Sequence, residues 1–372
     1  MWMQVALLLL ASLLHAGTTA NVEYNRYQSD SGVLDSTPAF EMATDLGSRA
    51  QLQLKYAVDA VSAASFNYAQ SKTHQGVRTA GNCNTCHPPQ DALSGATQSY
   101  LETRHGLTVG VTRGGPEGSV SVAYQMSREN DYSSDGANLH WQGDTPLSNT
   151  TLGLNLEVMK DGISSVNRQL SEFLFTQSVE ATLTHVFSPN TVMEAGYAFA
   201  SFDGYQQSPY AFVEIGNDSD HPQRVSQPRR RVRQDLTGTL KQGLWPGMAV
   251  QTDYRYYNDD WGVIGHTVEL TLSQKIGNWV LEPSLRRYWQ PEGAYFFKNF
   301  YDSLDEYRSR DLKLAPHSTR LLGLALRGRF SEHVGALLGY SYYLREDSLD
   351  YSRYWGNGPE SANMMQFILT YE

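Results

Sequence analysis

Apolar residues alternate with polar ones along most of this chain, with a period of two. Within residues 52–58, for example, Leu52, Leu54, Tyr56 and Val58 are apolar and polar or small residues lie between them. Similar stripes recur toward the C-terminus, each roughly ten residues long, which is the length that a tilted β-strand needs to cross a bilayer. About fourteen stripes are clear. A further pair near 22–27 and 39–45 raises the expected number of strands to about sixteen.

The connections between these stripes alternate between short and long. Short turns carry Gly, Pro or Asn, as at Pro246-Gly247 and Gly277-Asn278. The longer polar segments are roughly 63–100, 131–135, 161–170, 205–229, 259–263, 291–316 and 346–360. Such sorting is typical of outer-membrane barrels and not of a soluble sandwich or propeller. The sequence therefore predicts an all-β fold, a transmembrane antiparallel β-barrel of 14–16 strands with short periplasmic turns and long outer loops.

The N-terminus resembles an export signal. Residues 5–14 read VALLLLASLL and small residues follow up to Ala20. This apolar run is too short to span a bilayer as a helix. We therefore predict a signal peptide at residues 1–20, although no Lys or Arg precedes the run, and a barrel at 21–372 in the bacterial outer membrane.

The charged residues exclude one class of partner and predict a polar lumen. The net charge is −10, from 39 acidic and 29 basic residues, which argues against a nucleic-acid partner. Residues of both signs occupy the polar positions between the apolar stripes, where we expect a polar lumen. Among them are Lys55, Asp59, Glu180, Glu194, Arg233, Asp235, Lys241, Asp253, Arg255, Glu269, Glu282, Arg286, Arg327 and Arg329. The basic run 229–233 is expected at the rim or in the lumen, facing acidic neighbours.

The only two cysteines lie in the segment Cys83-Asn84-Thr85-Cys86-His87, which has the form C-x-x-C-H. Two thiols at this spacing can each add to a vinyl group of a porphyrin, and the adjoining His87 then serves as the proximal ligand of the iron. A thioredoxin-like dithiol, a zinc site or a plain disulfide would use the same cysteine pair. The histidine directly after Cys86 favours covalently bound haem c.

The haem motif falls in the longest expected loop, at about 63–100, on the outer side of the membrane. A long loop without secondary structure is usually functional. For the sixth ligand of the iron, the first candidate is His74 in the same loop, and His105 is the second. By parity His105 shares the lipid-facing register of Leu107. Met126, His140 and a five-coordinate haem are weaker alternatives, with His140 expected near an outer loop.

Two short phrases carry a family resemblance: Asp59-Ala60-Val61-Ser62-Ala63-Ala64-Ser65 and Thr103-Arg104-His105-Gly106. They resemble a family of bacterial outer-membrane barrels of unknown function. The resemblance implies an association with flavin-transfer proteins and extracytoplasmic electron transfer. The family usually has Gly where this chain has Ala63. Separately, Cys83, Cys86 and His87 resemble the attachment residues of c-type cytochromes.

Three functions follow as hypotheses. The first is a barrel with one haem c that exchanges electrons at the cell surface with a cytochrome, a flavoprotein or further copies of itself, as a carrier more than an enzyme. The second is a porin or transporter in which C-x-x-C-H is structural or regulatory. The third is an enzyme with a five-coordinate, peroxidase-like haem.

Overall fold

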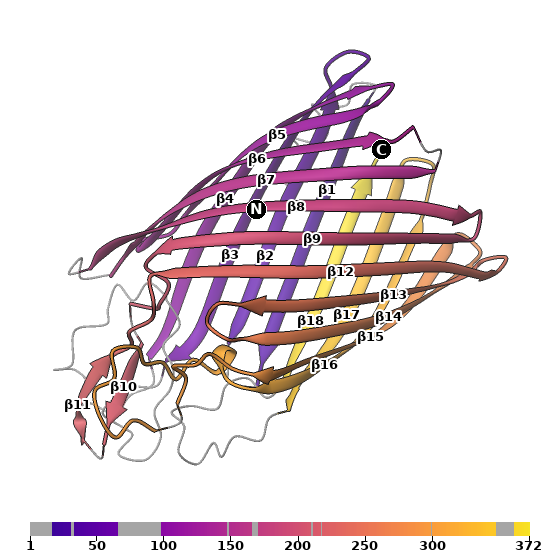
Figure 1. Ribbon diagram of the computed structural model, residues 1–372. Coiled ribbons are helices and arrows are strands. Elements are labelled where there is room, and N and C mark those ends of the chain that lie inside the picture. The colour runs from indigo at the N-terminus through magenta and orange to yellow at the C-terminus, as the bar shows by residue number, and fades with distance from the viewer. Residues whose placement is uncertain are drawn as a thin grey trace.

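The computed structural model describes residues 17–30, 33–65, 98–146, 149–165, 170–209, 211–216, 218–298, 300–346 and 361–372. Within these residues sixteen antiparallel strands close into one barrel, and two further strands form a separate hairpin (Figure 1). None of the described residues belongs to a helix long and apolar enough to cross a membrane. The prediction of an antiparallel barrel of about sixteen strands is confirmed.

Every barrel strand pairs with its neighbour in sequence, except that β9 pairs with β12 across the hairpin and β18 closes the barrel against β1. The first nine strands are β1 (Thr18–Ser29), β2 (Leu34–Asp45), β3 (Ala50–Ser65), β4 (Gln98–Gly115), β5 (Gly118–Arg128), β6 (Tyr132–Asp144), β7 (Thr150–Ser164), β8 (Ser171–Ser188) and β9 (Thr191–Gly204). The hairpin is β10 (Phe212–Ile215) and β11 (Asp218–Arg224). The remaining strands are β12 (Arg230–Trp245), β13 (Met248–Asp259), β14 (Ile264–Ile276), β15 (Trp279–Glu292), β16 (His317–Arg329), β17 (Val334–Glu346) and β18 (Ser361–Tyr371).

The two ends of the barrel differ in how their strands are joined. At one end β12–β13 and β14–β15 are joined by two residues each, whereas β9–β12 and β15–β16 are joined at the other end by long segments. Gly247 and Gly277 have φ of 85° and 63°, a left-handed conformation that glycine adopts without strain, so these turns can be tight. By the barrel rule, the short-turn end is periplasmic and the long-loop end is outer.

The strands have an apolar outer face and a polar inner face. Exposed apolar residues alternate along the outside, as in Leu152, Leu154, Leu156 and Val158 of β7. Aromatic residues gather near both ends of the outer face. Those near the periplasmic end are Trp141, Phe187, Trp245, Trp279, Phe330 and Tyr371, and those toward the outer end include Tyr24, Tyr56, Tyr124, Phe173, Tyr254 and Tyr342. An apolar band between two aromatic girdles is the surface that a bilayer requires.

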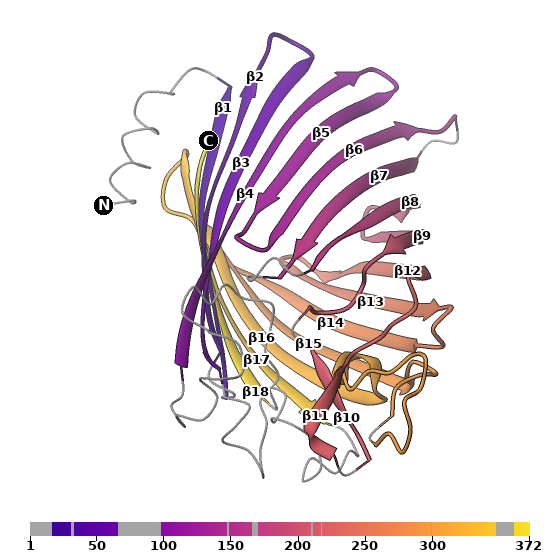
Figure 2. The same ribbon diagram turned by 90° about the vertical axis from the view of Figure 1, so that its left-hand side faces the viewer.

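Two long outer segments pack on each other beyond the barrel. We call the described residues of 205–229 and 293–316 the outer platform. Figure 2 shows β10 and β11 beside the orange segment of this platform, below the strands. Backbone bonds join the two segments, from Gly216 N–H to the Tyr301 carbonyl at 2.6 Å and from Arg308 N–H to the Ser226 carbonyl at 2.7 Å. The platform has its own apolar core, in which Val213, Val225 and Tyr301 are buried together.

The strand limits agree closely with the expectations from sequence. The expected pair near 22–27 and 39–45 corresponds to β1 and β2, which are somewhat longer. The expected signal peptide lies outside the described residues up to position 16, and β1 already begins at Thr18.

Candidate functional site

The C-x-x-C-H motif belongs to the connection between β3 and β4. Cys83, Cys86, His87 and the candidate ligand His74 lie outside the described residues. The ends of that connection are Ser65 and Gln98, which pair with each other at the outer end of the barrel. The motif thus belongs to a connection on the outer side. Among the described residues no group of three or more His, Cys, Asp or Glu side chains could hold a metal ion.

His105, the second candidate ligand, lies on the outer face of β4. It shares that face with Leu107, as its parity predicts, and its Nδ1 lies 2.8 Å from the Tyr56 hydroxyl of β3. The same arrangement recurs on β13 and β14, where His266 Nδ1 lies 2.9 Å from the Tyr254 hydroxyl. Such pairs suit the membrane interface, where the ring is apolar and its polar end is hydrated. This bond occupies only Nδ1, so iron binding by His105 would have to use Nε2.

His140 was expected near an outer loop, and that expectation is wrong. It faces the lumen from β6, opposite Ser121 and Asn155, in the periplasmic half of the barrel. The strand runs from Tyr132 at the outer end to Asp144 at the other, so the neighbouring Trp141 belongs to the periplasmic girdle. His317 was not singled out from the sequence. It faces the lumen at the outer end of β16, with its Nδ1 2.8 Å from the Ala315 carbonyl, which makes Nδ1 the protonated nitrogen.

The lumen wall formed by β1–β9 is predominantly acidic, and we call it the acidic wall. Its lumen-facing carboxylates include Glu23, Asp35, Glu41, Asp59, Glu157, Asp161, Glu172, Glu180 and Glu194. On its strands, Lys55 and Arg104 are the lumen-facing cations among the described residues. Glu180 and Glu194 are exposed to the lumen; Glu194 accepts a hydrogen bond from Thr184 at 2.9 Å, and neither forms an ion pair with a described residue.

The wall formed by β12–β18 carries arginines in ion pairs, and we call it the basic wall. Its lumen-facing cations are Arg231, Arg233, Lys241, Arg255, Lys275, Arg286, Arg327, Arg329 and Arg345. Arg286 Nε donates to Glu269 at 2.7 Å and Arg327 donates to Glu282 at 3.0 Å, each across neighbouring strands. In these pairs the arginine side chains are 49% and 55% exposed, whereas the carboxylates are 22% and 17% exposed. The guanidinium groups therefore extend into the lumen and their partners stay close to the wall.

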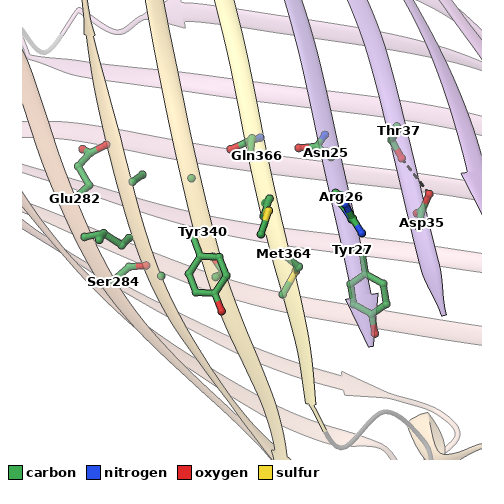
Figure 3. Close-up of a pocket in the computed structure, with 16 residues that line it drawn as sticks. Asn25, Arg26, Tyr27, Asp35, Thr37, Glu282, Ser284, Tyr340, Met364 and Gln366 are labelled. Atoms are coloured by element: carbon green, nitrogen blue, oxygen red, sulfur yellow. Dashed lines mark hydrogen bonds between the residues drawn. The ribbon is translucent and has the colours of Figure 1, made fainter. Parts of the chain in front are cut away.

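A hollow of about 360 Å³ lies in the lumen wall where β15–β18 meet β1 and β2 (Figure 3). Small side chains make room for it, since Gly323, Ala325 and Gly339 line it together with Ser284 and Ser341. Its polar groups come from residues that Figure 3 labels on several strands: Asn25, Asp35, Glu282 and Gln366. Its polar groups are hydroxyl, amide and carboxylate groups, and apolar side chains such as Leu324 and Met364 supply most of the remaining lining.

At the outer mouth the platform is tied to the basic wall. Gln290, on β15, is buried and donates to the carbonyls of Ala315 at 2.7 Å and Lys313 at 3.1 Å. Arg345, on β17, donates to the carbonyl of Leu312 at 2.8 Å. These bonds hold the short 3-10 helix η3 (Leu312–Leu314) against the lumen wall.

The basic run 229–233 meets the expectation in part: Arg229 and Arg231 pair with carboxylates, whereas Arg233 lies over an aromatic ring. Arg229 pairs with Glu172 at 2.9 Å, and Arg233 lies over the Phe202 ring at 4.2 Å. Arg231 is almost fully buried: its Nε donates to Asp259 at 2.9 Å and its guanidinium covers the Trp261 ring at 4.1 Å. The side chain of Asp259 is completely buried, so this pair is structural and lies beneath the platform.

Comparisons with known proteins support the barrel fold and the location in the outer membrane. The solved structure of a bacterial polysaccharide outer membrane secretin is similar over 96% of this chain and 99% of its own, with 11% identity and a TM-score of 0.55. CdiB from Acinetobacter baumannii is similar over 96% of this chain at 8% identity and a TM-score of 0.54, and this chain spans 60% of CdiB. The siderophore receptor PirA from the same species has a TM-score of 0.46 at 10% identity, over 90% of this chain and 53% of its own.

The closed barrel has the apolar belt that a bilayer requires, and its fold is similar to that of an outer membrane secretin, so the protein resides in the bacterial outer membrane. No curated protein matches the sequence. One family does match, over residues 6–177 and 174–367, which together cover nearly the whole chain. Its description is "Protein of unknown function (DUF3570)". The chain belongs to the DUF3570 family.

Proposed function

We propose that this barrel carries one covalent haem c on its β3–β4 connection and takes part in electron transfer at the cell surface. The single observation that carries the proposal is the C-x-x-C-H sequence at residues 83–87, in a connection whose ends lie at the outer end of the barrel. Cys83 and Cys86 would form the thioethers, and His87 would be the proximal ligand. His74 remains the first candidate for the sixth ligand.

A single haem would need redox partners, because the membrane is too thick for one haem to span. The apolar core of a bilayer is about 30 Å thick, and electron tunnelling decays steeply over such a length. A single haem on the outer side cannot by itself connect the two sides of the membrane. The donor and acceptor would therefore be other redox proteins, such as a cytochrome or a flavoprotein, or further copies of this chain.

The test is an absorption spectrum of protein extracted from outer membranes of cells that express the haem-maturation machinery. Reduction by dithionite should give a c-type band that persists after denaturation, and a pyridine haemochrome should give one haem per chain. The variant Cys83→Ala with Cys86→Ala should lack the band and still insert as a barrel. Absence of the band from the unaltered protein would refute the proposal.

A second function is favoured by a separate observation, the hydrated lumen. Arg255, Arg286 and Arg327 face inward and are each about half exposed. Charged side chains on the inner face that remain in water are typical of a barrel with an aqueous channel. In this function the protein is a channel for small polar solutes, and the haem or a Cys83–Cys86 disulfide would be structural or regulatory. Swelling of liposomes in a neutral sugar that is unchanged by the double cysteine variant would favour it.

A further inference from the structure

The lumen has an excess of carboxylates on the acidic wall and an excess of cations on the basic wall, although carboxylates such as Asp253 also face the lumen on the basic wall. The acidic wall holds exposed Glu180 and Glu194 on β8 and β9, with no cationic partner among the described residues. The basic wall, by contrast, presents arginines whose carboxylate partners are largely covered. Because the two walls are different arcs of one closed barrel, positive and negative groups meet the same body of water from different sides.

The ion pairs of the basic wall do not cancel this separation. In the Arg286–Glu269 and Arg327–Glu282 pairs the arginine side chain is more than twice as exposed as the glutamate side chain. Each pair is therefore oriented, with its positive end toward the lumen. The pair Arg255–Asp235, on β13 and β12, has the same orientation, at 48% and 20% exposed. Three pairs on adjacent strands thus point the same way.

On β7–β9 the acidic wall has the opposite character, whereas its Arg104–Asp59 pair on β4 and β3 is oriented like the pairs of the basic wall. Glu157 accepts a hydrogen bond from Gln125 at 2.6 Å, and Glu194 accepts one from Thr184 at 2.9 Å. Neutral donors leave the negative charge of these carboxylates in place. Glu157, Glu180 and Glu194 lie on three consecutive strands, so they form a band across β7–β9.

Opposite charges on the walls of a narrow aqueous space create a field across it, which low-dielectric walls concentrate. A solute with one charge is attracted to one wall and repelled by the other. A zwitterion gains at both ends when its ammonium group points to the acidic wall and its carboxylate points to the guanidinium groups. We infer that the lumen selects small zwitterionic solutes that carry both an ammonium and a carboxylate group, of the class of amino acids and dipeptides. This inference rests on the channel function described above.

The experiment is osmotic swelling of liposomes that contain the full chain. The probes are glycylglycine and an uncharged polyol of similar size. The inference predicts that glycylglycine enters several-fold faster than the polyol. Two double variants test the walls separately: Glu180→Gln with Glu194→Gln, and Arg286→Gln with Arg327→Gln. Each should lower the rate for glycylglycine toward that for the polyol and leave the polyol rate unchanged.

Ion selectivity in planar bilayers gives a second readout. With a KCl gradient, the glutamate variant should shift the reversal potential toward anion preference and the arginine variant should shift it toward cation preference. Thr182→Ser is the matched control, because Thr182 is a neutral lumen-facing residue beside Glu180 on β8. It should change neither readout.

The outcomes distinguish a failure of the channel function from a failure of the inferred selectivity for zwitterions. If neither solute enters and no current flows, the channel function is wrong and the inference falls with it. If the polyol enters but glycylglycine is no faster, the channel function stands and the inference is wrong. The inference is also wrong if both variants shift the reversal potential in the same direction.

Discussion

The two walls of the lumen differ in how their charged side chains are paired and exposed to water. On the acidic wall, Glu180 and Glu194 lie in water without an ion pair to a described residue. On the basic wall, Arg286 and Arg327 are paired but still half exposed, and Arg231 is paired and almost entirely buried beneath the outer platform. The difference follows from hydration. A charge in water needs no partner, whereas a charge that is removed from water is tolerated only with a partner and further hydrogen bonds.

The largest effect is expected where the charge is buried deepest. Asp259→Asn would leave Arg231 buried without its anion, and would also weaken the bonds that Asp259 accepts from Tyr257 and from the Trp261 and Val263 backbones. Breaking a buried pair by removing one partner costs about 3–5 kcal/mol. Urea unfolding in lipid vesicles, followed by tryptophan fluorescence, should show a loss of this size. A loss as small as that of an exposed pair would contradict the structural role of Asp259.

The next effect is expected in the core of the platform. The hydroxyl of Tyr301 donates toward the Phe296 carbonyl at 2.7 Å and accepts from Ser309 N–H at 2.7 Å, and the residue is fully buried. Tyr301→Phe leaves these buried groups unsatisfied, at a cost of about 1–3 kcal/mol. Limited proteolysis should cut the platform faster and leave the barrel intact. Tyr295→Phe, at an exposed platform residue, is the control and should leave the cleavage rate unchanged.

A smaller effect is expected at an ion pair in the hydrated lumen. Glu282→Gln removes the carboxylate that pairs with Arg327, but the arginine is 55% exposed and can be solvated. The free energy of unfolding should fall by less than about 1 kcal/mol, the usual range for exposed pairs. The measurement is the same urea titration as for Asp259→Asn. A loss equal to that of the buried pair would mean that the lumen is not aqueous at this position.

The smallest effect is expected at the surface of the platform. A hydrogen bond from Lys298 lowers the pKa of Asp305, and the same bond raises the pKa of Lys298. A carboxyl group whose folded pKa is lowered stabilises the fold above its unfolded pKa, near 4 for aspartate, and that contribution is lost as the pH falls through the folded value. Since Lys298 is half exposed and Asp305 is partly exposed at the surface, salt screens the effect. Proteolysis of the platform should become slightly faster on acidification, and Asp305→Asn should remove that dependence.

The sequence predicted the barrel because alternation, strand length and turn chemistry are local signals. It also predicted that Asp59, Glu269 and Arg286 face the lumen, since parity decides the face. It did not predict which charges pair, because pairing depends on the register between strands. The platform could not be predicted either: Tyr301 meets Val213 and Val225 through contacts between segments that are distant in sequence. His140 was misplaced because it lies eight residues from the outer end of β6 and only four from its periplasmic end.

The candidate haem site depends almost entirely on the sequence, since residues 83–87 lie outside the described part of the chain and only the strands that lead to them are placed. The topology adds that the connection between β3 and β4 begins and ends on the outer side of the membrane. It also places His105 on the outer face of β4 with its Nδ1 bonded to Tyr56, so an iron would have to bind Nε2.

The measurement that tests the central claim most directly is the intact mass of the mature protein, purified from outer membranes, followed by mapping of its peptides. The account predicts a mass larger than that of the polypeptide by one haem, located on the peptide that contains Cys83 and Cys86, and lost in the Cys83→Ala, Cys86→Ala variant. An unmodified polypeptide from cells that attach haem to other C-x-x-C-H proteins would contradict the account.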